Sequence, residues 1–292
     1  MNTKIWITAF AIVASIIPVT ALAEQTPVTI SSSYNTDSDG VKNSTVTIAT
    51  AKERNPFNFS YSRLKIQQRD SADSVDENAL KINWNYRINE ERGYRAWVNL
   101  SQNNIWNHAS YGLQYYGVAN TIDKVTASYS HEAVQTLAAY QNCIMGDNLA
   151  MEYRQEIYRD LTLDTKVKYA SYSDSNYRKS FSTGLTKAFG RHYRVGLMYD
   201  YDTSDVNKKS VFYLPKQQSS LSLTMEAAVK IGEGSLLLKR TDSLFSRDVT
   251  GRINKTTYGV TYRLRNLNLG LQYYKDDNYW AREFSCSWSN RW

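Results

Sequence analysis

The C-terminal stretch from Trp280 to Trp292 alternates in side-chain character with a period of two. Trp280, Phe284, Trp288 and Trp292 share one mostly apolar face, whereas the other face carries the polar residues Glu283, Ser285, Ser287, Ser289 and Arg291. A β-strand alternates its side chains in this way and rises about 3.3 Å per residue, so roughly ten such residues cross the apolar slab of a bilayer when tilted. An aromatic residue at the edge of that slab is typical of a membrane interface. The stretch therefore predicts the closing strand of an outer-membrane β-barrel, with an edge strand of a soluble β-sandwich as the alternative.

The N-terminal residues predict export from the cytoplasm. Lys4 supplies a positive charge, residues 5–19 are largely apolar, and Ala21-Leu22-Ala23 fits the small-residue cleavage rule. We therefore predict a signal peptide over residues 1–23 and a mature barrel over residues 24–292. A retained membrane helix is the alternative, but the apolar run is short for one. The mature protein is then expected in the bacterial outer membrane, with membrane lipid and lipopolysaccharide as partners.

The composition and length of the chain set the size of the expected barrel. Twenty-three Tyr, seven Trp and only four Pro make the chain rich in aromatic strand formers. Apolar runs that alternate with polar residues meet at short turns such as Gly232-Glu233 and Arg265-Asn266. One strand with its connection takes roughly 17 to 20 residues. We therefore predict an all-β fold, a transmembrane antiparallel up-and-down β-barrel of about 14–16 strands with 16 favoured.

Four segments are less regular. Residues 132–140 fit a helix as well as a strand, and their context assigns them to a strand. Charged or polar loops are expected over residues 67–78 and 242–255, and a longer segment covers residues 202–218. If that last segment folded inward, it would set what can pass through the barrel.

The polar face of the strands is expected to line a lumen in which bases outnumber acids. A low-dielectric wall focuses such a field and raises the local concentration of anions. The alternative is that the charges form cross-strand ion pairs that hold the wall together. Inward-pointing aromatic rings would suit the apolar faces of sugar rings, although a Tyr-rich chain places some rings there by chance. The residues expected to contact a solute are Arg87, Arg95, Trp97, Arg154, Lys166, Lys168, Arg194, Arg263 and Tyr274.

Enzymatic functions find little support in the sequence. His108, His131 and His192 have no nearby Ser or Asp at a spacing that would orient a base toward a nucleophile. The sequence has no metal-ligand cluster and no Gly-rich phosphate loop. We therefore expect no enzymatic activity, no cofactor and no metal, and nothing beyond the net charge of +7 favours nucleic acid as a partner. A barrel esterase or lipid-modifying enzyme is the remaining alternative.

Two C-terminal stretches resemble a known family. The segment Phe212-Tyr213-Leu214-Pro215-Lys216-Gln217-Gln218 approaches a strand through an aromatic residue, a proline and a base. The segment from Tyr273 to Trp292 carries an Asp in the loop, Arg-Glu entering the strand, alternating small polar residues and a terminal basic-aromatic pair. Ser173-Asp174-Ser175-Asn176-Tyr177-Arg178 is a weaker third match. Together these stretches resemble the C-terminal barrels of exopolysaccharide exporters, those for poly-N-acetylglucosamine and for bacterial cellulose.

The resemblance implies a sixteen-stranded barrel that passes a growing polysaccharide outward, with periplasmic synthesis or export proteins as partners. Most members carry a helical-repeat domain on the periplasmic side, which we do not expect here because little sequence separates Ala23 from the first predicted strand. The exporters of poly-N-acetylglucosamine have an acidic lumen, whereas the expected lining here is basic. The sequence therefore favours export of a neutral or acidic polysaccharide. The alternatives are a diffusion porin for anionic oligosaccharides, similar to barrels that take up oligogalacturonate or sialic acid, and a structural or adhesive barrel.

Overall fold

A computed structural model describes most of the chain after the predicted signal peptide. It describes residues 28–37, 42–50, 57–67, 74–118, 123–205, 214, 216–247, 251–276 and 280–291. The predicted signal peptide over residues 1–23 lies outside these residues. Most of the segment between residues 206 and 215, with Phe212, Tyr213 and Pro215 of the family resemblance, also lies outside them.

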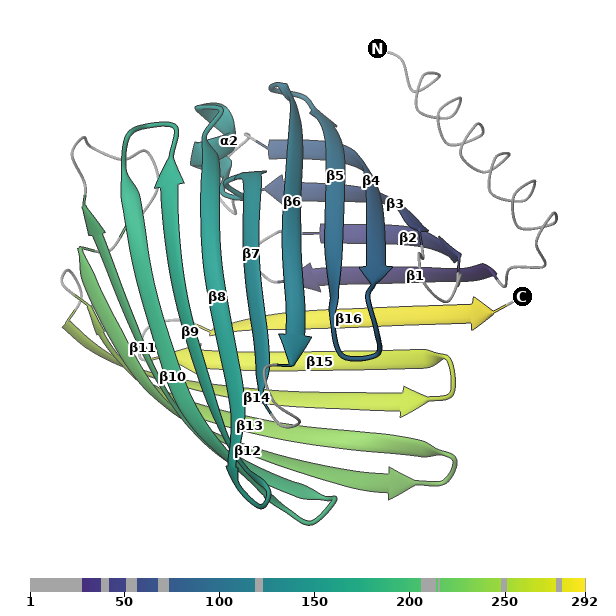
Figure 1. The fold of residues 1–292 in the computed structure, drawn as a ribbon, viewed down its shortest axis with the longest axis vertical. Helices are drawn as coiled ribbons and strands as arrows, with labels where there is room; N and C mark the ends of the chain where they lie inside the picture. Colours follow the sequence, from purple (N-terminus) through teal and green to yellow (C-terminus); the bar gives the residue numbers. More distant parts are fainter. Residues whose placement is uncertain are drawn as a thin grey trace.

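Sixteen antiparallel strands close into one barrel, in which each strand pairs with its neighbours in the sequence and the first strand pairs with the last. Figure 1 shows β1 lying beside β16. The predicted up-and-down β-barrel is confirmed, with the favoured count of 16 strands. In the described part of the chain, no helix is both long and apolar enough to cross a membrane. The strands are β1 (Val28–Asp37), β2 (Lys42–Thr50), β3 (Phe57–Gln67), β4 (Ser74–Arg87), β5 (Gly93–Asn103), β6 (Asn107–Val118), β7 (Lys124–Ala133), β8 (Met145–Tyr158), β9 (Leu161–Tyr172), β10 (Tyr177–Phe189), β11 (Tyr193–Asp205), β12 (Gln217–Ile231), β13 (Gly234–Arg247), β14 (Gly251–Leu264), β15 (Leu267–Asp276) and β16 (Trp280–Arg291).

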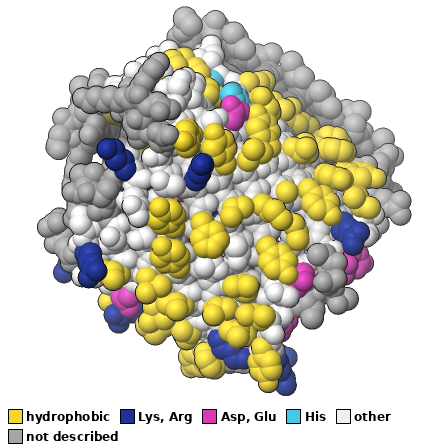
Figure 2. Space-filling model, turned by 60° about the vertical axis from the view of Figure 1, so that its left-hand side comes forward, with side chains coloured by type: hydrophobic (Ala, Val, Ile, Leu, Met, Phe, Trp, Pro, Cys, Tyr) yellow, Lys and Arg dark blue, Asp and Glu magenta, His cyan; other side chains and the backbone are white. Residues whose placement is uncertain are grey.

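The outside of the barrel carries the apolar side chains of every strand. Cross-strand register aligns Leu185, Leu197 and Leu223 in one row over β10, β11 and β12, and each of these side chains is exposed by 39% or more. In Figure 2, hydrophobic side chains spread over the outer face in a broad band, while most charged side chains lie toward its edges. Such a band removes its apolar surface from water only when lipid covers it. The outer face is therefore built for contact with a bilayer.

Four of the connections at the end of the barrel where β1 begins and β16 ends are turns of two or three residues. These four turns are residues 159–160, 190–192, 232–233 and 265–266. Asp160, Gly190, Gly232 and Arg265 have positive φ angles between 46° and 63°, the backbone conformation that lets so short a connection reverse the chain. At the opposite end, the connection between β7 and β8 is long enough to contain a helix, α2 (Leu137–Gln141). Bacterial outer-membrane barrels have the same asymmetry between periplasmic turns and external loops.

Three expectations from the sequence are wrong in detail. Strand β4 begins at Ser74, strand β13 continues to Arg247 and strand β14 begins at Gly251. Residues 74–78 of the first expected loop, and residues 242–247 and 251–255 of the second, are therefore strand. The charges there fit a strand because they are neutralised in place: Arg63 pairs with Asp76, as Arg240 does with Asp242. Residues 137–141 are helical rather than extended.

The start of α2 explains that last difference. The Thr136 hydroxyl accepts a hydrogen bond from the Ala139 amide at 3.2 Å and caps the first turn. The side chains of Ala139 and Tyr140 are buried against other parts of the barrel. Packing outside the segment therefore decided between helix and strand, which the sequence pattern left open.

Leu197 and its neighbour Met198 give a matched test of the two faces, because Met198 points inward and is 40% exposed. A base in lipid costs roughly 2–4 kcal/mol at the midplane, whereas the lumen tolerates one. We expect Leu197→Arg to lower the free energy of unfolding of the barrel in vesicles by about that amount. Met198→Arg should change this free energy little. Urea titration of the folded fraction, followed by heat-modifiable gel mobility, measures both. Equal losses for the two variants would contradict the assignment of faces.

Candidate functional site

Hydroxyl side chains line one half of the inner wall. The Ser222 and Ser243 hydroxyls share a hydrogen bond of 2.8 Å between β12 and β13, and those of Thr224 and Thr241 share one of 3.0 Å on the same two strands. Register places these groups on the face opposite to the apolar band. The inner faces of β12 to β16 and of β1 to β3 are called the hydroxyl arc. Its other small polar residues include Ser33, Thr45, Thr47, Ser60, Thr257, Thr261, Ser285 and Ser287.

Charged side chains line the other half of the inner wall, from β4 to β11, which we call the charged arc. Arg154 on β8 pairs with Asp164 on β9, and Lys166 on β9 pairs with Glu152 on β8. Arg178 on β10 pairs with Asp202 on β11, with 2.8 Å between Nη2 and Oδ2. These pairs join adjacent strands, so much of the basic lining is neutralised within the wall.

All nine residues singled out in the sequence lie on the inner side of the register. Their partners divide them into three groups, and their contact with a solute stays a proposal. Arg154 and Lys166 belong to ion pairs, and Arg95 donates from Nε to Asn85 at 2.8 Å. The two aromatic rings each lie under a base. Among the described residues, no ion pair is found for Arg87, Lys168, Arg194 or Arg263.

Each of the two predicted aromatic residues presents its ring to a lysine. Lys81 Nζ lies 4.4 Å from the centre of the Trp97 ring, and Lys255 Nζ lies 4.8 Å from that of Tyr274. Gly112 faces Trp97 across β5 and β6, and a Cβ at this glycine would come within 2.6 Å of the indole. The absence of a side chain at Gly112 therefore lets the indole lie flat against the wall.

The connection between β7 and β8 folds into the barrel mouth, which the sequence did not predict. Helix α2 contacts β4, three strands away from β7 in the barrel. Tyr140 of α2 is 1% exposed, and beneath it the inward-facing Val75, Glu77 and Ala79 of β4 are buried. A loop that bridges these strands on the inner side narrows the end of the lumen opposite to the start of β1 and the end of β16.

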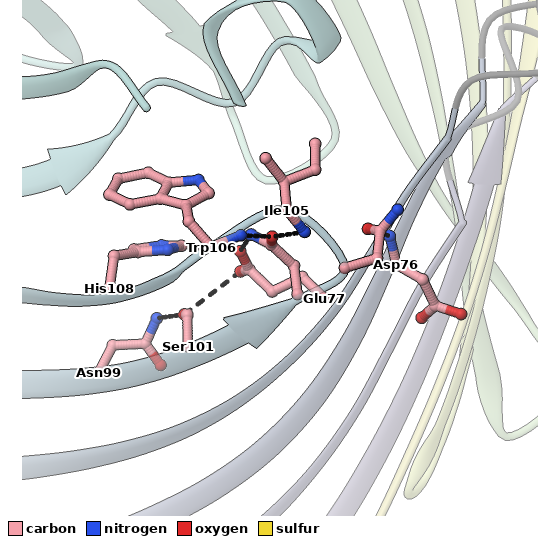
Figure 3. A network of polar contacts seen from close by, with 9 residues as sticks. Asp76, Glu77, Asn99, Ser101, Ile105, Trp106 and His108 are labelled. Atoms are coloured by element: carbon pink, nitrogen blue, oxygen red, sulfur yellow. Dashed lines mark hydrogen bonds and ion pairs between the residues drawn. The ribbon is translucent and has the colours of Figure 1, made fainter. Parts of the chain in front are cut away.

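A network of polar contacts under α2 holds the Glu77 carboxylate, as Figure 3 shows. The Ser101 hydroxyl donates to Glu77 Oε1 at 3.3 Å and Asn103 Nδ2 donates to Oε2 at 3.5 Å. His108 Nε2 lies 3.6 Å from Oε2, and the Trp106 ring stacks on His108 with centroids 4.5 Å apart. Burial costs a carboxylate free energy unless hydrogen bonds compensate it, so this network fixes the inner wall where α2 lies on it.

Tyr140 completes the contact from the helix side. Its ring meets that of His108 edge-on, with centroids 6.0 Å apart. Burial, and then the neighbouring Glu77 carboxylate, raise the pKa of the Tyr140 hydroxyl far above its ordinary value. The hydroxyl therefore stays protonated and able to donate toward Glu77 at any physiological pH. The only sequence signal for this site was the helical pattern over residues 132–140.

The inner wall also has a recess lined by charged and polar side chains. Within the described ranges, no group of three or more His, Cys, Asp or Glu side chains is placed to hold a metal ion. This recess, on the charged arc, is lined by alternating acids and bases, among them Lys124, Glu152, Arg154, Asp164 and Lys166. Such a surface can hydrogen-bond a polar solute from several strands at once.

Comparison with known proteins finds likeness in fold alone. No family model and no curated protein matches the sequence. A solved structure described as a bacterial polysaccharide outer membrane secretin is similar, with a TM-score of 0.73 and 11% identity over 89% of this chain and 97% of that one. CdiB from Acinetobacter baumannii gives 0.56, with 10% identity over 91% of this chain and 60% of its own. OccK11 (OpdR) of Pseudomonas aeruginosa gives 0.53, with 9% identity over 91% and 95%. The chain thus has the fold of outer-membrane channel barrels, and the resemblance to polysaccharide-export barrels holds for its fold.

The inward position of α2 predicts a narrowed channel. We expect Tyr140→Ala to free α2 from the wall and raise single-channel conductance, because the ring that packs on His108 is lost. Gln135→Ala, at an exposed position of the same loop, should leave conductance unchanged. Recordings in planar bilayers measure both variants. An unaltered conductance for Tyr140→Ala would show that α2 does not limit the passage.

Proposed function

We propose that this protein is a saccharide channel of the bacterial outer membrane that exports a neutral or acidic polysaccharide. The division of the inner wall into a hydroxyl arc and a charged arc carries the proposal. The likeness in fold to a polysaccharide outer membrane secretin supports it. In this proposal the mature chain begins after residue 23, faces lipid and lipopolysaccharide, and receives its polymer from periplasmic synthesis or export proteins.

The hydroxyl arc supports passage of a polymer without tight binding. Each hydroxyl can exchange its cross-strand partner or water for a sugar hydroxyl, and such exchanges have a small net free energy of about 0.5–1.5 kcal/mol each. Conduction needs many weak sites rather than one strong site. A wall of serine and threonine on many neighbouring strands meets this need along the path.

The charged side chains of the whole lumen support a neutral or acidic polymer over a cationic one. The acids Glu152, Asp164 and Asp202 are occupied by ion pairs, whereas Lys168, Arg194 and Arg263 have no such pair among the described residues. The residual field of the lumen is therefore basic. Trp97 adds a flat aromatic surface, which suits the apolar face of a sugar ring.

A diffusion porin for anionic oligosaccharides is the second candidate function. The unpaired bases favour it, since they would concentrate anions in an open pore. An open porin should conduct steadily as the wild-type protein, whereas a gated exporter should conduct only after α2 is released or a partner is added. Single-channel recording of the purified wild type separates the two.

Charge selectivity tests the basic lumen that both candidates need. We expect the triple variant Lys168→Gln, Arg194→Gln, Arg263→Gln to lose most anion preference, because it removes bases that no acid neutralises. The matched control Arg154→Gln with Asp164→Asn removes a complete ion pair and should leave selectivity close to the wild type. Reversal potentials in a salt gradient measure both. A preference that survives the triple variant would show that other groups set the field.

Variants at Trp97 and Trp84 compare a ring proposed to bind sugar with a ring that faces lipid. Trp97 points inward and Trp84 outward on neighbouring strands, where Trp84 stacks on Tyr86. We expect Trp97→Ala to weaken block of the current by added oligosaccharide several-fold, since stacking contributes about 1 kcal/mol. Trp84→Ala should leave the block unchanged. Identical block in the two variants would remove Trp97 from the path of the sugar.

A further inference from the structure

Two aromatic rings on the inner wall of β5 and β6 lie flat, because each faces a glycine on the neighbouring strand. Gly112 of β6 lies opposite Trp97 of β5, and Gly93 of β5 lies opposite Tyr116 of β6. A Cβ at Gly112 would come within 2.6 Å of the Trp97 indole, and one at Gly93 would come within 2.6 Å of Tyr116 Cζ. Each ring therefore covers its glycine, and both aromatic side chains stay partly exposed toward the lumen.

Two bases alternate with these rings on the adjacent strands β4, β5 and β6 (Figure 1). Tyr116 is level with the first residue of β5, Arg95 lies two residues further along β5, and Trp97 lies two residues beyond Arg95. Lys81 of β4 is level with Asn99, the next inward residue of β5. A strand rises about 3.3 Å per residue, so successive levels lie roughly 6.6 Å apart. We call Tyr116, Arg95, Trp97 and Lys81 the ring-and-base ladder.

The two bases of the ladder keep their charge. Arg95 donates from Nε to the amide oxygen of Asn85 at 2.8 Å, and a neutral amide does not compensate a guanidinium. Neither Arg95 nor Lys81 forms an ion pair with another described residue. Glu77 is the one carboxylate on the inner face of β4, β5 and β6 as the structure describes them, and the network under α2 already holds it. This part of the wall can therefore attract anions.

Lys81 is the movable member of the ladder. Its Nζ lies 4.4 Å from the centre of the Trp97 ring, over the face that a sugar would cover. The Glu132 carboxylate of β7 attracts Lys81 but forms no ion pair with it. An ammonium on a flexible stem can leave a ring for a carboxylate, because the charge-assisted hydrogen bond is the stronger interaction. A sugar that carries a carboxylate can thus take the place of Lys81 on the ring and bind its ammonium.

We propose that the ring-and-base ladder binds a polysaccharide whose sugars carry carboxylates, with sugar rings on Trp97 and Tyr116 and carboxylates on Arg95 and Lys81. This inference rests on the proposed saccharide channel and narrows its cargo to the acidic class. A flat aromatic ring suits the apolar face of a sugar, and lysine and arginine bind carboxylates through charge-assisted hydrogen bonds. A polymer of such sugars presents rings and charges in alternation, as the ladder does.

Equilibrium binding to the purified full chain in detergent tests the proposal and does not require an open channel. The probes are a hexamer of β-1,4-linked glucuronate and cellohexaose, which has the same linkage without carboxylates, each labelled at its reducing end. The test variant is Lys81→Gln with Arg95→Gln. We expect it to weaken binding of the glucuronate hexamer roughly 30-fold, or about 2 kcal/mol. The weaker binding of cellohexaose should stay unchanged. Fluorescence anisotropy measures both.

Two further variants separate binding at the ladder from net charge and from the shape of the wall. Lys230→Gln with Lys239→Gln removes the same charge from inner positions of β12 and β13, on the opposite side of the barrel, and should leave binding close to that of the wild type. Gly112→Ala places a Cβ against the indole and should weaken binding of both hexamers several-fold, because the Trp97 ring can no longer lie flat. Heat-modifiable gel mobility confirms that each variant is folded.

Three results would overturn the proposal. They are undiminished binding of the glucuronate hexamer by the folded test variant, an equal loss in the variant of β12 and β13, and binding of the glucuronate hexamer by the wild type that is absent or no tighter than that of cellohexaose. Block of the channel current by a neutral oligosaccharide would then still support the proposed function. Loss of block by every saccharide would instead count against the proposed function itself.

Discussion

The antiparallel pairing of β1 with β16 is the interaction on which the rest of the molecule depends. It runs from Thr29 opposite Arg291 to Asp37 opposite Glu283 and turns a sheet with two open edges into a closed cylinder. Unpaired backbone groups cannot be hydrated inside a bilayer, so only a closed sheet can lie there. Closure also creates an inside and an outside. The surroundings of each side chain in the wall then depend on whether it faces lipid or the lumen.

Because side chains alternate with a period of two, the sequence predicted which residues face outward and which face inward. A shift of one residue would turn a whole strand over, so the lipid-facing row Leu185, Leu197 and Leu223 and the inward positions of Trp97 and Arg263 follow from the same pattern. Strand ends were less well predicted, because charges such as Asp76 and Asp242 look like loop residues in a sequence. Their cross-strand or nearby bases neutralise them in the folded wall, and those partners are apparent only from register.

The narrowed mouth could not be predicted from the local sequence pattern. Helix α2 is five residues long, too short to be stable by its own propensity, and it exists because Tyr140 packs against His108 and Glu77 on strands far away in the sequence. Contacts between residues so far apart in the sequence produce no periodic pattern in that sequence. The buried Glu77 network has the same origin, since its donors come from β5 and β6.

The effect of the net charge of +7 depends on where in the barrel the charged side chains lie. Within the charged arc, bases such as Arg154 and Arg178 are consumed by ion pairs that strengthen the wall, and Arg240 is held by Asp242 where lipid would otherwise penalise it. Lumen bases such as Lys168, Arg194 and Arg263 have no ion pair among the described residues. These bases face the lumen, where anions come from outside the chain. Because the wall neutralises many of its other charges by internal ion pairs, the bases left without one support the proposed passage of a neutral or acidic saccharide.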